Sequence, residues 1–207
     1  MNPPTSLKDL ERSLYRSSTQ DGLIDIQVGS VLLVFAIAPL LSARLGDFWS
    51  SAIFLPFWAA VFYAARVFRR SQLQPRIGQI KFGPYRIKRL KNLTSFILVF
   101  NLAAFGLGLL AFFGLLEFPG WLPLSILLPA GFCLVGYTLE SSRFYLYAII
   151  SALTPITGEY LFRNHGFSHH GYPIAFGVLS GTILAWGIIL SIRVIRKYPL
   201  EDNGGRE

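Results

Sequence analysis

The sequence predicts an all-α integral membrane protein, a bundle of six transmembrane helices. Hydrophobic residues make up 53% of the 207-residue chain, and charged residues only 14%. The apolar residues stand in blocks of about 18 or more, the length that crosses a bilayer as a helix. The charge is gathered in short connecting segments, whereas a soluble domain of this size would spread it over its surface. We therefore expect residues 1–207 to form a single membrane domain.

Six apolar blocks define the expected spans. The first two are separated by a tight outer turn around Arg44, Gly46 and Asp47. The fifth block is the most polar, since its outer half contains Pro155 and Glu159. The expected spans are residues 25–41, 48–67, 93–116, 121–139, 144–161 and 172–194.

The distribution of Lys and Arg predicts the orientation. If the N-terminus is cytoplasmic, every Lys and Arg except Arg44 and Arg163 falls in a cytoplasmic segment, as the positive-inside rule requires. Both termini are then expected in the cytoplasm, with the protein in the cell inner (plasma) membrane. Residues 5–16 carry leucines at helical spacing between cations, which predicts an amphipathic helix lying on the cytoplasmic membrane face. The net charge of +8 has the same origin, so we expect no nucleic-acid partner.

The longest polar connection, residues 71–92, is basic. Apolar and cationic residues alternate on both sides of Gly83-Pro84, which predicts a short β-hairpin with one basic face. That face is a candidate binding site for a cytoplasmic or membrane protein partner or for anionic lipid head groups. The simpler alternative is a topology signal in ordinary lipid contact. The candidate binding residues are Arg76, Lys81, Arg86, Lys88 and Arg89.

Two carboxylates near span ends are candidates for an ion or proton site. Asp21 or Asp25 can cap the first span, whose free amides favour a carboxylate, or Asp25 can reach inward and titrate. Glu159 would face a helix break at Pro155, as in transporters with broken helices. It also stands four residues before Arg163, the spacing of a plain ion pair.

The three histidines, His165, His169 and His170, share one outer loop near Glu159. Imidazoles and a carboxylate can bind zinc, but the loop lacks the helical His-Glu-x-x-His spacing of a metalloprotease, so a solvated loop is expected. The single Cys133 excludes a disulfide or a cysteine cluster within one chain. We expect no metal, no cofactor and no catalytic residue.

Gly177 and Gly181 in the sixth span form a ridge of small residues on which another helix can pack closely. Packing inside the monomer and a homo-oligomer contact through these glycines are both compatible with the pattern.

Three motifs carry a resemblance: Asp21-Gly22-Leu23-Ile24-Asp25-Ile26, Pro75-Arg76-Ile77-Gly78 with Lys81-Phe82, and Arg143-Phe144-Tyr145-Leu146-Tyr147. With them the chain resembles a family of uncharacterised small prokaryotic integral membrane proteins over nearly its whole length. The resemblance implies a multi-span fold and residence in the bacterial inner membrane. It implies no activity and no catalytic residues.

These patterns favour a non-enzymatic membrane anchor or accessory subunit that acts through its basic cytoplasmic face. A small-solute or ion transporter or channel using a Pro-broken fifth helix is the alternative, with Asp25 or with Glu159 beside Thr154 and Thr157. A metal-dependent membrane enzyme using the outer histidines is a third class. Spans nearly free of central ionisable groups favour the first.

Overall fold

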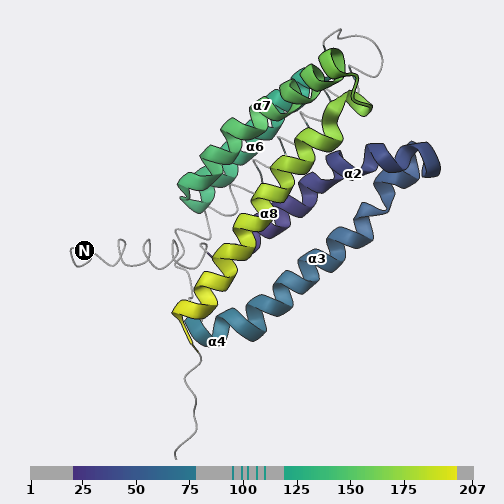
Figure 1. Ribbon diagram of the computed structural model, residues 1–207. Coiled ribbons are helices and arrows are strands. Elements are labelled where there is room, and N and C mark those ends of the chain that lie inside the picture. The colour runs from purple at the N-terminus through teal and green to yellow at the C-terminus, as the bar shows by residue number, and fades with distance from the viewer. Residues whose placement is uncertain are drawn as a thin grey trace, which may run out of the picture. The chain divides into compact units, whose positions relative to one another are not determined.

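The computed structural model describes residues 21–77 and 119–199, together with positions 95, 99, 102, 106 and 110. Every regular element in this part of the chain is helical, and it contains no strand (Figure 1). The chain divides into two compact units. Unit 1 comprises Met1–Ile80 and Tyr172–Glu207, and unit 2 comprises Lys81–Gly171.

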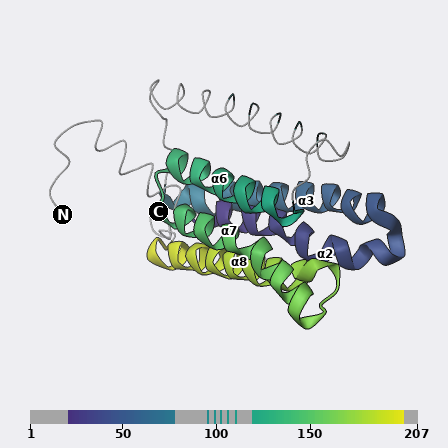
Figure 2. The same cartoon turned by 90° about the horizontal axis from the view of Figure 1, so that it is seen from above.

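In unit 1, the next helix along the chain and the last helix both pack against α2 (Leu23–Ala52). Gly46 leaves the helical path at φ 77° and ψ 162°, which only glycine adopts readily, so a turn at the expected position is confirmed. The chain then returns through α3 (Phe54–Phe68), the π-helical turn η1 (Arg69–Leu73) and α4 (Gln74–Ile77). The last helix is α8 (Tyr172–Lys197), which runs antiparallel to α2 (Figure 2).

Glycines let α2 and α8 approach closely. A Cβ built on Gly187 would lie 2.9 Å from the carbonyl oxygen of Gly22, and one on Gly29 would lie 2.7 Å from Cγ of Leu184. Close backbone approach of this kind strengthens helix contacts where lipid removes the hydrophobic driving force. The ridge of small residues expected at Gly177 and Gly181 contributes less to this helix contact. A Cβ built on Gly177 would make only an ordinary contact with Ala36 at 3.9 Å, and one on Gly181 would meet nothing within 4 Å.

Unit 2 contains the helical hairpin of α6 (Trp121–Leu139) and α7 (Ser142–His165). The turn between them is closed by the hydrogen bond from the Ser141 amide to the Gly136 carbonyl, 3.1 Å. The ring of Phe132 on α6 packs on Tyr147 across the hairpin, and the ring of Phe144 packs on Tyr147 within α7. The short 3-10 helix η2 (His169–Gly171) then folds back on the end of α7.

The expected break at Pro155 is wrong, because α7 runs without interruption through this buried residue. Proline removes one intrahelical hydrogen bond and crowds the carbonyl four residues earlier, yet membrane helices tolerate it when their neighbours hold the segment. The hydroxyl of Thr154 donates to the Ile150 carbonyl at 2.8 Å, one turn back along the same helix.

In the part of the chain that the structure describes, four helical stretches are long and apolar enough to cross a membrane: Leu23–Gly46, Phe48–Arg76, Trp121–Leu139 and His169–Lys197. They correspond to the first, second, fourth and sixth expected spans. The fifth is helical but does not meet this description, because threonines and the Glu159–Arg163 pair reduce its apolar character. Of the third, only the five isolated positions are described, all helical. The described residues thus support four spans where the sequence predicts six.

The second span is longer than expected, which corrects the reading of the basic loop. Residues 75–77, the expected start of a β-hairpin, belong to helix α4. Alternation over three residues cannot distinguish strand from helix, and the helix continues because Leu73 is buried against α2 and α8. The rest of the expected hairpin and the amphipathic helix expected at residues 5–16 lie outside the described residues.

Large apolar side chains cover the outside of these helices. On α3, the side chains of Leu55, Phe62, Tyr63 and Val67 are all exposed. Meanwhile the hydroxyls of Ser30 and several other span residues donate to carbonyls of their own helix. An apolar surface, with hydroxyls that bond to their own helix, suits a helix in lipid, where water is unavailable as a partner.

We predict that Gly187→Ala destabilises unit 1, whereas the matched control Gly181→Ala does not. The new methyl group of the first variant must push apart two backbones, at a cost of about 1–3 kcal/mol. That of the second enters open space. Thermal unfolding of both purified variants in the same detergent measures the difference, and equal melting temperatures would contradict the proposed crossing.

Candidate functional site at the basic end of unit 1

The ends of α3 and α8 meet beside the start of α2. Leu23, Ala65 and Leu73 form a buried apolar cluster there, with Ile26, Phe68 and Val194 packed around it. All described Lys and Arg residues of unit 1 except Arg44 lie at these helix ends, and we call this region the basic end. Its cations are Arg66, Arg69, Arg70, Arg76, Arg193, Arg196 and Lys197.

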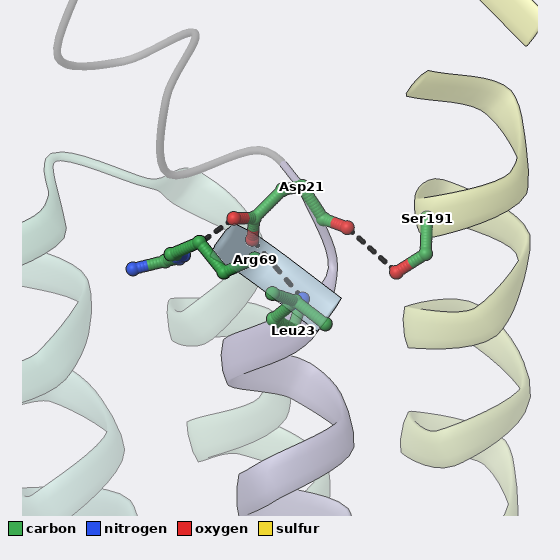
Figure 3. A network of polar contacts seen from close by, with 4 residues as sticks. All are labelled: Asp21, Leu23, Arg69 and Ser191. Carbon is green, nitrogen blue, oxygen red and sulfur yellow. Dashed lines mark hydrogen bonds and ion pairs between the residues drawn. The ribbon is translucent and has the colours of Figure 1, made fainter. Parts of the chain in front are cut away.

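Asp21 joins three helices at the basic end (Figure 3). Its carboxylate accepts a hydrogen bond from the Leu23 amide at 3.1 Å and an ion pair from Arg69 at 2.6 Å. Its backbone carbonyl accepts the hydroxyl of Ser191 at 2.7 Å. The expected capping of the first span by Asp21 is therefore confirmed. The carboxylate is only 2% exposed, so these donors replace the water that it has lost.

Arg76 ties the start of the basic loop to the end of α8. Its guanidinium donates to the carbonyl oxygens of Ile195 at 2.9 Å and Tyr198 at 3.2 Å. The last carbonyls of a helix lack intrahelical partners and carry the negative end of its dipole, so a cation suits them. Of the five candidate binding residues in the loop, Arg76 has this structural role. Lys81, Arg86, Lys88 and Arg89 lie outside the described residues.

The remaining cations of the basic end face outward. Among the described residues none of them has an ion-pair partner, and their side chains are exposed: Arg66, Arg70, Arg193, Arg196 and Lys197. The two acids of this end, Asp21 and Asp25, are both buried, the second completely. The described surface of the basic end is therefore positively charged, with no exposed carboxylate to offset it.

The two candidate ion-site carboxylates belong to different units. Asp25 lies in the first turn of α2 in unit 1, and Glu159 lies in α7 of unit 2. The Glu159–Arg163 ion pair is confirmed, with a distance of 2.7 Å from Nε to Oε1. The hydroxyls of Thr154 and Thr157 donate to carbonyls of α7 itself. Both hydroxyls are therefore bonded within a continuous helix and do not line a break beside Glu159.

Of the three histidines, His170 contacts Glu159 and the other two do not. Its Nδ1 lies 3.0 Å from Oε2 of Glu159, and its ring packs on Phe162 with centroids 4.5 Å apart. His165 instead contacts the rings of Tyr160 and Phe167. Within the described residues, no three His, Cys, Asp or Glu side chains are grouped closely enough to hold a metal ion.

Sequence reasoning missed Arg69 and Ser191 as partners of Asp21. Arg69 is one of three neighbouring arginines, with Arg66 and Arg70. In the sequence all three indicate only the cytoplasmic end of a span, and nothing distinguishes Arg69 from the other two. Ser191 stands four residues after Gly187, so both small residues lie on the face of α8 that meets Asp21 and Gly22. That spacing was the available signal, but nothing in the sequence linked it to residue 21.

Comparisons of the chain with protein-family models, curated proteins and solved structures give no match.

We predict that Asp21→Ala destabilises unit 1 by about 1–3 kcal/mol, because it leaves Arg69 without its buried partner and the Leu23 amide without an acceptor. Asp21→Asn is the matched variant, since it keeps the acceptor for Leu23 and removes only the charge. It should retain part of the stability. Equilibrium unfolding in mixed detergent micelles measures both, and a wild-type value for Asp21→Ala would contradict the role of the network.

Proposed function

We propose that this chain is a non-enzymatic integral membrane protein that serves as an anchor or accessory subunit, with its basic end as the contact face for a protein partner. The observation that carries the proposal is the arrangement of charge in unit 1. Cations are exposed where α3 and α8 end, while the acids of the same end are buried. A one-signed surface favours an oppositely charged partner and speeds its association.

The same arrangement supports the orientation. Arg44 is the single described cation near the opposite end of unit 1, beside the turn at Gly46. The positive-inside rule then places the basic end, and with it the C-terminus, in the cytoplasm. We propose six spans, adding α7 and residues 93–116 to the four apolar helices, in a cell inner membrane. The resemblance to small prokaryotic membrane proteins agrees with this location and remains part of the proposal.

The loop of residues 71–92 is the proposed docking segment. Arg76 fixes the described start of the loop, the end of α4, against the end of α8. The same loop contains Lys81, Arg86, Lys88 and Arg89. We propose that an acidic surface of the partner binds these loop cations.

We predict that reversing the charge of Arg86, Lys88 and Arg89 to Glu releases the partner and leaves the membrane helices folded. The tagged full-length protein is purified in mild detergent, and the proteins that remain bound in stoichiometric amount are identified by mass spectrometry. Like charges facing each other cost several kcal/mol at an interface, so the loss should exceed tenfold.

Arg44→Glu is the control, because it reverses an exposed charge at the opposite end of unit 1. It should retain the partner. A partner that stays bound to the triple variant, or a wild-type protein that holds none, would refute the proposed docking function.

A further inference from the structure

Four exposed cations of the basic end stand in two pairs, each pair one helical turn apart. Arg66 in the last turn of α3 and Arg70 in η1 form what we call the α3 pair, and Arg193 and Lys197 in α8 form the α8 pair. Like charges at this spacing repel each other and weaken a helix unless an anion lies between them. Neither pair has an ion-pair partner among the described residues, and all four side chains are exposed.

Helix length places both pairs at the depth of lipid head groups. The two spans that end here, Phe48–Arg76 and His169–Lys197, are each 29 residues long. Roughly 20 helical residues cross the hydrocarbon, so several residues of each stretch lie beyond it. Counted from Phe48 and from Tyr172, where α8 begins, twenty residues end at Val67 and at Ser191. Residues 68–76 of the first stretch and 192–197 of the second then lie beyond the hydrocarbon. The cationic pairs therefore fall at or just past the hydrocarbon boundary.

The polar network supports the same boundary. Arg69 and Ser191, which both bind Asp21, lie within two residues of the two limits just counted. A buried carboxylate with an arginine and a hydroxyl is far less costly at the edge of the hydrocarbon than at its centre. The start of α2 therefore lies level with the limits counted for the other two stretches.

We propose that the α3 pair and the α8 pair bind the phosphate groups of anionic glycerophospholipids in the surrounding leaflet. Two cations four residues apart match a phosphodiester, and each of the three arginines in the two pairs can donate two parallel hydrogen bonds to its oxygens. A zwitterionic lipid also carries a cation, which the same basic surface repels, so it binds there more weakly. The pairs are thus a lipid-selective surface within the basic end, and the loop residues Arg86, Lys88 and Arg89 that the partner test changes are not part of it.

This inference rests on the membrane placement proposed above but not on the protein partner, and the test is therefore made without one. The purified full-length chain is reconstituted in phosphatidylcholine bilayers, and the association of spin-labelled phosphatidylglycerol is compared with that of spin-labelled phosphatidylcholine. Each basic residue near an anionic surface contributes about a fivefold preference at most. Wild-type protein should therefore favour phosphatidylglycerol several-fold.

The variant Arg66→Gln/Arg70→Gln/Arg193→Gln/Lys197→Gln should bring the ratio close to one. Arg44→Gln, a neutralised cation at the opposite end of unit 1, should leave it at the wild-type value. If the fourfold variant fails to fold, raising the salt around wild-type protein to about 1 M replaces it. The Debye length then falls to about 3 Å, and the preference should collapse.

A wild-type ratio of one, a fourfold variant that folds and keeps the preference, or a preference that withstands salt would each overturn the inference. A lipid preference in a protein that holds no protein partner would refute the docking function alone. Partner binding without lipid preference would refute only the lipid surface.

Discussion

The carboxylate of Asp21 is the interaction on which unit 1 depends. It is buried, it is charged, and it stands immediately before the first membrane helix, so it must find donors close by. The structure supplies one donor from each of three helices when the backbone carbonyl is included. Those donors can reach residue 21 only if α2, α3 and α8 are held at a fixed height relative to one another. The glycine crossing of α2 and α8 allows that approach, since any side chain at Gly187 would separate the two backbones.

The distribution of charge follows from this arrangement. The two acids of the basic end are buried, and Asp21 caps α2 and pairs with Arg69. Most of the cations that do not bind them are exposed. Arg69 pairs with Asp21 and Arg76 donates to the end of α8, while Arg66 and Arg70 are exposed. A row of arginines that looks uniform in the sequence thus separates into residues that hold the fold together and residues that meet the surroundings.

Sequence patterns predicted the elements better than their contacts. The fourth expected span matches α6 residue for residue, and the turn at Gly46 lies where glycine and flanking charge indicated. Hydropathy fixes such features because bilayer thickness acts on each segment separately. It could not predict that α7 passes through Pro155, since a neighbouring helix decides whether a proline is tolerated. Nor could it find the pairing of Arg69 with Asp21, which depends on the height at which separate helices pack.

The π-helical turn at Arg69–Leu73 sets the direction in which the end of this helix points. A π turn holds one residue more than an α turn, and each residue rotates a helix by about 100°. Arg76 stands three residues beyond the turn and donates to the carbonyls at the end of α8. A helix one residue shorter in this turn would therefore rotate the guanidinium away from those carbonyls.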